Sequence, residues 1–146
     1  MSIRMRGSYH ENDSKRGKHM YALKDSGVLC EKEQGGNLGY ILGKNSYFVN
    51  TDYKVLQSQT GGVFIPCMKM LYNGNVELYY VTDGFCPITS ILADIAPDTL
   101  TTILMNLFAN IIEVRNNGFL KCQNLDISWD KLFVDTATLK VRLVYL

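Results

Sequence analysis

The chain has 146 residues, of which 47% are hydrophobic and 20% charged, and its formal net charge is +1. This composition is typical of one globular domain and excludes an extended disordered protein. So small a net charge provides no global field to attract nucleic acid or an acidic membrane. No apolar run reaches the ~18 residues that span a bilayer.

Histidine and cysteine usage narrows the possible chemistry. His10 and His19 both lie in a polar N-terminal stretch, so the apolar part of the chain has no histidine to act as a general base or metal ligand. The cysteines are widely spaced and form no C-x-x-C pair, which favours reduced thiols in a cytoplasm. We therefore predict no metal and no cofactor, and we exclude Ser-His and Cys-His hydrolases.

Residues 1–44 are predicted to form a flexible or undetermined N-terminal extension. Met1 to about Met20 are polar and basic without a periodic apolar face, so we expect proteolysis to remove them and leave a folded core. The stretch GGNLGYILG (35–43) matches no phosphate-binding motif, and a flexible turn is the preferred interpretation. Nucleic-acid binding through the basic tail is a third hypothesis, which predicts salt-dependent DNA affinity that is lost with residues 1–20.

The folded domain is predicted to span residues 45–146. Short strands are expected at 46–49 and 53–59. A strand hairpin is expected around Asn73-Gly74, a dipeptide that forms type I′ turns. The stretch CPITSILADI (86–95) predicts a short helix.

The strongest periodic pattern predicts a helix that begins at Pro97 and stops at Gly118, a residue suited to a left-handed C-terminal cap. Its apolar residues recur at the spacing of one stripe, for which a core face is favoured over a partner-binding face. We expect Leu107 and Phe108 to lie in the core, and Phe108→Ala to cost about 3–5 kcal/mol. The stripe comprises Leu100, Ile103, Leu104, Leu107, Phe108, Ile111 and Ile112.

A second hairpin is expected at the end of the chain, around Thr136-Ala137. Alternation in TLKVRLVYL would turn Leu139, Val141, Leu143 and Tyr145 toward the core. The predicted fold class is therefore α+β, with antiparallel strand hairpins packed on a long amphipathic helix.

This order of elements is similar to the middle of a protein-kinase fold. ELYYVTDG (77–84) takes the place of the hinge, and residues 118–135 take the place of the catalytic loop. Phosphoryl transfer needs an aspartate in that loop and a metal-binding aspartate after the following hairpin. Those positions hold Lys121-Cys122 and Val144-Tyr145-Leu146. We therefore assign no catalytic, cofactor-binding or metal-binding residue, and we predict no phosphoryl transfer.

A nucleotide-binding pseudokinase or weakly active kinase fragment is the alternative hypothesis. It would use Lys69 as the phosphate-contacting lysine, together with the hinge-like segment, and Asn124 as a relic of a metal-binding asparagine. The aspartates Asp126, Asp130 and Asp135 are instead interpreted as turn and cap residues. We expect Asn124 and Asp126 to tie down the loop, and Trp129 to pack it against the closing hairpin.

Residues 45–146 also resemble a bacterial N-terminal domain of unknown function that precedes a forkhead-associated (FHA) domain. The resemblance is carried by GVFIP (62–66), Tyr79-Tyr80, the helical stretch and the closing unit ISWDKLFVD…VRLVYL. It implies a non-catalytic, cytoplasmic scaffold domain with a degenerate kinase-like layout. The FHA module would read phosphothreonine on protein partners, and this chain would be C-terminally truncated. We expect no nucleic-acid partner and no membrane insertion.

Overall fold

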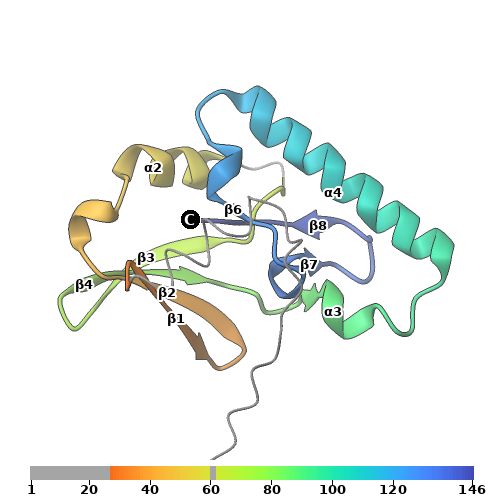
Figure 1. Ribbon diagram of the computed structural model, residues 1–146, viewed down its shortest axis with the longest axis horizontal. Coiled ribbons are helices and arrows are strands. Elements are labelled where there is room, and N and C mark those ends of the chain that lie inside the picture. The colour runs from red at the N-terminus through yellow and green to blue at the C-terminus, as the bar shows by residue number, and fades with distance from the viewer. Residues whose placement is uncertain (1–26, 60–61) are drawn as a thin grey trace, which may run out of the picture.

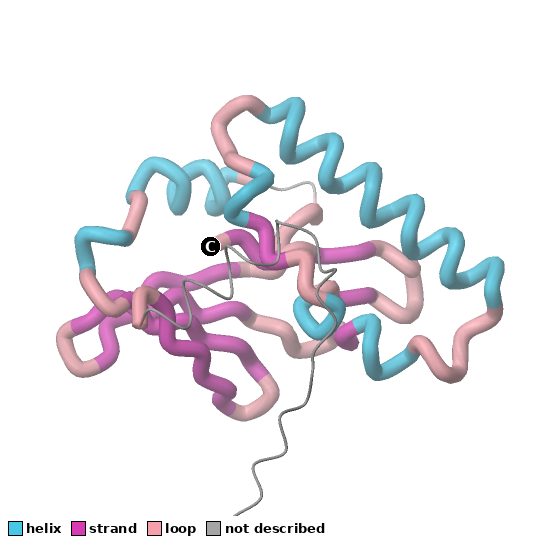
Figure 2. The backbone as a smooth tube through the Cα atoms, in the orientation of Figure 1, coloured by secondary structure: helices cyan, strands magenta, loops and turns pink. Residues whose placement is uncertain are grey.

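The structure is a computed structural model that describes residues 27–59 and 62–146. Its mixed α+β architecture, with antiparallel sheets and one long helix, confirms the predicted class. A four-stranded sheet occupies one end of the molecule and the long helix α4 the other (Figure 1). Figure 2 shows the same division, with the longest strands on the sheet side. The predicted tail, Met1 to about Met20, lies outside the described residues.

The four-stranded sheet is built from two antiparallel hairpins. Strands β1 (Leu29–Gln34) and β2 (Asn37–Leu42) form the first, and β3 (Cys67–Tyr72) and β4 (Asn75–Tyr80) form the second. Because β2 also pairs with β4, the strand order is β1-β2-β4-β3. The outer strands are therefore β1 and β3.

Each hairpin turns through two residues with positive φ. The φ angles are 49° and 81° at Asn73 and Gly74, and 58° and 84° at Gly35 and Gly36. Positive φ at both central residues is the requirement of a type I′ turn. The hairpin predicted at Asn73-Gly74 is thus confirmed, whereas the flexible turn predicted for residues 35–43 is wrong. Gly35-Gly36 is instead a tight turn between two ordered strands.

The predicted domain boundary at residue 45 is wrong, because β1 and β2 precede it and belong to the core. Tyr40 has no exposed surface, and Leu29, Leu38 and Leu42 are buried beside it. The polar strand LCEKEQ conceals this pairing in the sequence, because Leu29 is the one buried residue of β1 and the strand shows no alternation of apolar and polar residues.

The strands predicted at 46–49 and 53–59 are also wrong. A 3₁₀ helix, η1 (Asn45–Tyr47), leads into α2 (Asn50–Ser58). Two side chains of α2 bond to the open edge of β3: Gln57 Nε2 donates to the Cys67 carbonyl at 2.6 Å, and the Lys69 N–H donates to the Tyr53 hydroxyl at 3.2 Å. These contacts favour the helix over the strand that the β-branched and aromatic residues suggest.

The predicted short helix is confirmed as α3 (Ile88–Ile91), which follows the two-residue strand β5 (Cys86–Pro87). The long helix is confirmed as α4 (Pro97–Asn117), with Gly118 at φ 77° as its left-handed cap. The α4 side chains of Asn106 and Asn110 donate to the carbonyls of Leu139 and Val141, at 2.8 and 2.5 Å. These bonds fix which side of α4 faces the closing hairpin.

Short elements complete the chain after α4. They are η2 (Cys122–Asn124), β6 (Leu125–Asp126), η3 (Trp129–Lys131), β7 (Phe133–Val134), β8 (Val141–Arg142) and β9 (Val144–Tyr145). Strands β7 and β8 form the predicted hairpin, which β5 extends to three strands, while β6 pairs with β9. In the part of the chain that the structure describes, no helix has the length and apolar character to cross a membrane.

Two hydrophobic clusters form the interior, one beneath the four-stranded sheet and one beneath α4. Val141, Leu143 and Tyr145 are buried in the α4 cluster as predicted, and Leu139 is half-buried against it. Val144 is equally buried but belongs to the sheet cluster. Alternate residues at the end of the chain thus pack into different clusters and join the two halves.

Candidate functional site

Polar side chains line the contact between the four-stranded sheet and the β6–β7 loop; we call this contact the seam (Glu31, Tyr40, Asp126 and Lys131). Tyr40 donates its hydroxyl hydrogen to Asp126 Oδ2 at 3.3 Å, and Asp126 is only 1% exposed. Asp126 Oδ1 also accepts a hydrogen bond from the Ser128 N–H at 3.1 Å. Burial raises the pKa of Tyr40 well above its ordinary value, and the Asp126 and Glu31 carboxylates raise it further. The Ser128 bond confirms the predicted turn role of Asp126, and the Tyr40 bond also holds the loop against the sheet.

Lys131 makes the second polar contact of the seam. Its ammonium donates a hydrogen bond to Glu31 Oε1 and lies 3.4 Å from Asp130 Oδ2. Burial on its own would lower the pKa of Lys131, but the bonds and charges of Glu31 and Asp130 outweigh it and keep that pKa above its ordinary value. The Lys131 side chain is 8% exposed, so this cation is held inside the fold.

Trp129 does not pack the loop as predicted. It lies 53% exposed on η3, two residues before the buried Lys131. A 3₁₀ helix has about three residues per turn, so residues two apart lie on different sides of it. The turn that directs Lys131 inward therefore directs Trp129 outward.

The residues considered for phosphoryl transfer lie far apart. Lys69 is on the edge strand β3, where its ammonium sits 4.2 Å from the centre of the Phe48 ring. Asp135 lies in the β7–β8 turn and accepts hydrogen bonds from the N–H groups of Ala137 and Thr138. These backbone bonds lower the pKa of Asp135. Figure 1 places β3 and the β7–β8 turn on opposite sides of the molecule.

The hinge-like segment is tied to the first hairpin. The N–H groups of Thr82 and Asp83 donate to Asn37 Oδ1 at 2.9 and 3.2 Å, and the Thr82 hydroxyl donates to the Gly36 carbonyl at 2.7 Å. A nucleotide base lying along this segment would have to compete with Asn37 for these two donors. The contacts thus give the segment a structural role.

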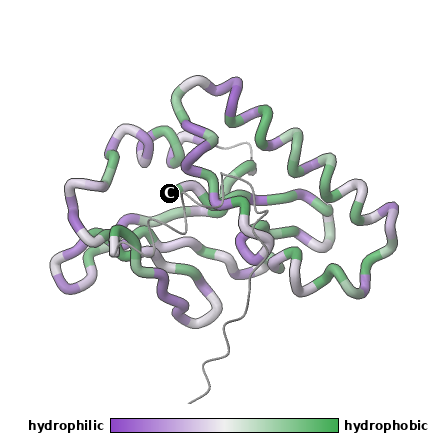
Figure 3. Tube along the Cα trace, in the orientation of Figure 1, coloured by the Kyte–Doolittle hydropathy of each residue, from purple (hydrophilic) through white to green (hydrophobic). Residues whose placement is uncertain are grey.

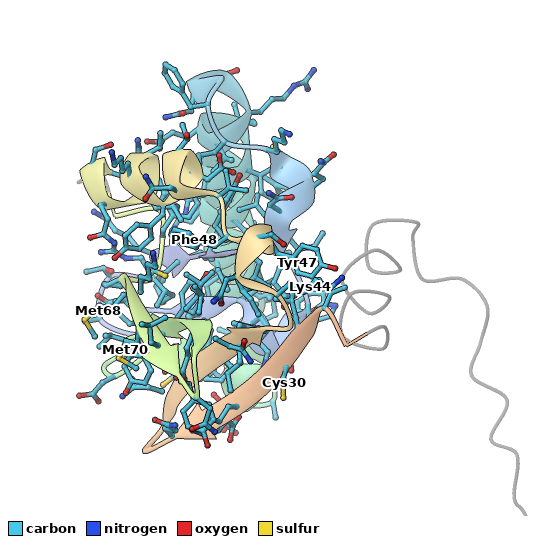
Figure 4. The ribbon with its side chains drawn as sticks, turned by 90° about the vertical axis from the view of Figure 1, so that its left-hand side faces the viewer. Cys30, Lys44, Tyr47, Phe48, Met68 and Met70 are labelled. Atoms are coloured by element: carbon cyan, nitrogen blue, oxygen red, sulfur yellow. The ribbon has the colours of Figure 1, made fainter. Side chains whose placement is uncertain are left out.

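A cavity of about 330 Å³ lies between α2, η1, the four-stranded sheet and the end of the chain. Most of its wall is aliphatic or aromatic, and its polar lining residues are Asp52, Gln123 and Asn124 together with the tyrosines Tyr47, Tyr53 and Tyr145. The Tyr145 hydroxyl donates to Asp52 Oδ2 at 2.7 Å and accepts hydrogen bonds from Asn124 Nδ2 and the Lys121 N–H. Asn124 thus ties down the loop, as expected. Figure 4 shows Phe48 between α2 and β3.

The outer face of α4 carries a row of exposed apolar side chains, Met105, Phe108 and Ile112, which we call the α4 stripe. Their exposed fractions are 66%, 59% and 57%. The prediction that Phe108 lies in the core is therefore wrong, whereas Leu107, at 8%, is buried as predicted. Figure 3 shows hydrophobic residues recurring along the whole of α4, so their spacing could not reveal which side is covered.

Sequence reasoning missed the seam and the cavity. The seam joins Glu31 to Lys131 and Tyr40 to Asp126 across 100 and 86 positions of the chain, so no local motif announces either pair. The one local signal was Asp126-x-Ser128, a spacing at which an aspartate commonly bonds the backbone two residues on. The cavity depends on α2, which was predicted as a strand.

Across residues 27–59 and 62–146, no group of three or more His, Cys, Asp or Glu side chains is placed to hold a metal ion. Comparison with models of known protein families finds no match to the chain, and comparison with curated proteins finds none either. The function must therefore be argued from the seam, the cavity and the α4 stripe.

Proposed function

We propose that this chain is a non-catalytic protein-interaction domain, of the kind that precedes an FHA domain in bacterial cytoplasmic signalling proteins. The α4 stripe carries the proposal. Contiguous exposed apolar surface on a globular protein commonly marks a site where another protein binds, and here three large side chains line one side of a single rigid helix. A protein partner would cover this stripe, while the FHA domain would read phosphothreonine.

The proposal includes a degenerate kinase-like layout. The order of elements supports it: hairpin β3–β4 leads through a connector to α4, then to a loop and to hairpin β7–β8. The pairing of β6 with β9 closes that loop against the end of the chain.

The environment of the charged residues supports a domain without catalysis. Phosphoryl transfer needs several charged groups that converge on the transferring group and are not held by other side chains or by the backbone. Here Asp126 and Lys131 are buried in the seam, Asp135 is bonded to its own turn, and Lys69 packs on an aromatic ring. In the pseudokinase alternative, a nucleotide base along the hinge-like segment would also need the N–H groups of Thr82 and Asp83, which donate to Asn37.

A thermal-shift titration with ATP and Mg²⁺ separates these two functions. We expect no rise in the melting temperature. A ligand at about 100 times its dissociation constant would stabilise the fold by roughly 2.7 kcal/mol, which the assay detects. A saturable rise that Lys69→Ala removes would establish the nucleotide-binding alternative.

Affinity purification from cells that naturally make the chain tests the interaction itself. The full chain is compared with a Phe108→Ser/Ile112→Ser double variant and with Glu113→Gln, a matched change at an exposed polar position of the same helix. We expect the wild type and Glu113→Gln to retain the same protein partner and the double variant to lose it. Equal retention by all three would contradict the proposed role of the stripe.

A further inference from the structure

We propose that the cavity beneath α2 is a binding site for a small molecule that has an apolar body and a hydrogen-bond-donating head, with a protonated amine as the best-fitting head. This site lies apart from the α4 stripe and does not depend on the proposed protein interaction. Its argument rests on the size of the cavity, the chemistry of its wall and the position of Asp52.

The size and wall of the cavity fit a compact apolar molecule. Its volume of about 330 Å³ falls at the lower end of the range for ligand pockets, roughly 300–1,000 Å³. Leu29, Leu42 and Leu78 of the sheet and Leu56 of α2 supply aliphatic wall. A cavity with an apolar wall of this kind binds apolar molecules, because water gains few hydrogen bonds inside it.

The polar atoms of the cavity select the head group. The Tyr145 hydroxyl has one hydrogen, which it donates to Asp52, and it accepts from Asn124 and from the Lys121 N–H. A hydroxyl has two acceptor lone pairs, so this arrangement leaves Tyr145 no capacity for a ligand. The Asp52 carboxylate has about four acceptor positions, and Tyr145 occupies one of them. Gln123 and Asn124 also line the cavity, and their amides can donate or accept. Among the lining side chains Asp52 is the carboxylate, so a head that donates to Asp52 gains the strongest contact.

Charge sets the direction in which a ligand would lie. An anionic head would be repelled by Asp52, whereas an ammonium would form a charge-assisted hydrogen bond with it. The ammonium of Lys69 covers the ring of Phe48, a lining residue, so repulsion between two cations disfavours an amine near that ring. An amine head would therefore lie at Asp52, away from the Phe48 wall.

The segment that carries Tyr47 and Val49 leaves a route into the cavity. These two lining residues are 44% and 54% exposed, so the wall that they form is open to solvent. Figure 4 shows Tyr47 and Phe48 on this segment, below α2 and above β3. A ligand can enter here without unfolding the sheet.

Three probes with the same alkyl chain test the site: octylamine, 1-octanol and octanoate, each titrated into the full chain and followed by amide chemical shifts. We expect octylamine to bind most tightly, 1-octanol to bind more weakly and octanoate not to bind. The shifted amides should belong to α2, η1 and β9. Asp52→Asn keeps the shape and removes the charge, so it should weaken octylamine about fivefold, the difference between a charged and a neutral hydrogen bond, and leave 1-octanol close to wild type.

Val49→Trp supplies the second variant, since this exposed position can take a large ring that narrows the entrance without disturbing the core. It should abolish binding of both octylamine and 1-octanol, while Phe108→Ala on the α4 stripe should leave both unchanged. The proposal is overturned if neither probe saturates, if octanoate binds as well as octylamine, or if binding survives Val49→Trp. Because Phe108→Ala alters the α4 stripe and not the cavity, unchanged binding in this variant shows that the cavity site and the proposed partner site are tested separately.

Discussion

The seam and the α4 stripe reverse the usual rule of burial. In the seam, the charged side chains of Asp126 and Lys131 are buried and hydrogen-bonded between the sheet and a loop. On the α4 stripe, Phe108 and two other large apolar side chains face solvent, and no described residue covers them. Buried charge demands partners that the fold itself supplies, whereas exposed apolar surface gains free energy only when another molecule covers it. The charges thus serve the fold, and the apolar stripe is the surface that we propose a partner covers.

The largest loss of stability should come from a substitution on the buried face of α4, and it sets the scale for substitutions on the exposed face. Leu107→Ala should destabilise the domain by about 2–5 kcal/mol, because it leaves a void in the α4 cluster. Urea unfolding of the purified variant measures this loss. A loss below about 1 kcal/mol would mean that the inner face is loosely packed and that the two faces differ little.

The next effect should come from the buried carboxylate of the seam. Asp126→Ala leaves the Tyr40 hydroxyl and the Ser128 N–H without this acceptor, so it should cost roughly 1.5–3 kcal/mol. The same unfolding measurement applies. An exposed control outside the seam, Asp94→Ala, should stay within about 0.5 kcal/mol of wild type. Equal losses in the two variants would contradict the distinction between buried and exposed aspartates.

The Glu31–Lys131 pair should give a smaller effect that depends on pH. The pKa of Lys131 is higher in the folded state than its ordinary value of about 10.4 in the unfolded state. The ion pair therefore stabilises the fold fully below pH ~10.4, and this stabilisation is lost as pH rises through the higher pKa of the folded state. Glu31→Gln should therefore be less stable than wild type at pH 8, and the gap should narrow above pH ~11. Chemical unfolding across this range checks the trend. A constant gap would mean that the pair does not act through charge.

The sequence was sufficient where structure depends on neighbouring residues. Asn73-Gly74 specified a turn, and Pro97 and Gly118 specified both ends of α4, because φ requirements and capping act locally. The sequence was insufficient where contacts with distant segments determine the conformation. The polar strand β1 becomes a strand by pairing with β2, and α2 is held by the edge of β3.

The same limit explains the error at Phe108. Leu107 and Phe108 are adjacent, so they point about 100° apart on the helix, and both belong to an apolar pattern that runs around most of α4. The side of α4 that the β7–β8 hairpin covers is the side that carries Asn106 and Asn110, because these two side chains bond to carbonyls of that hairpin. That contact lies more than 30 positions away in the sequence, so periodicity alone could not locate it.

The smallest effect on stability should come from the α4 stripe itself. Phe108→Ala should change the free energy of unfolding by no more than about 0.5 kcal/mol, because this ring already faces solvent. Urea unfolding beside Leu107→Ala gives the comparison under identical conditions. A loss near that of Leu107→Ala would place the Phe108 ring in a packed environment.

Photo-crosslinking from position 108 tests the role of the stripe most directly. Benzoylphenylalanine in place of Phe108 keeps an aromatic group on the stripe, and the same group in place of Glu113 provides the control on another exposed side of α4. In cells that naturally make the chain, position 108 should yield a discrete protein adduct that Ile112→Lys abolishes, and position 113 should not yield it. No adduct from position 108, or the same adducts from both positions, would contradict the assignment of the α4 stripe as an interaction surface.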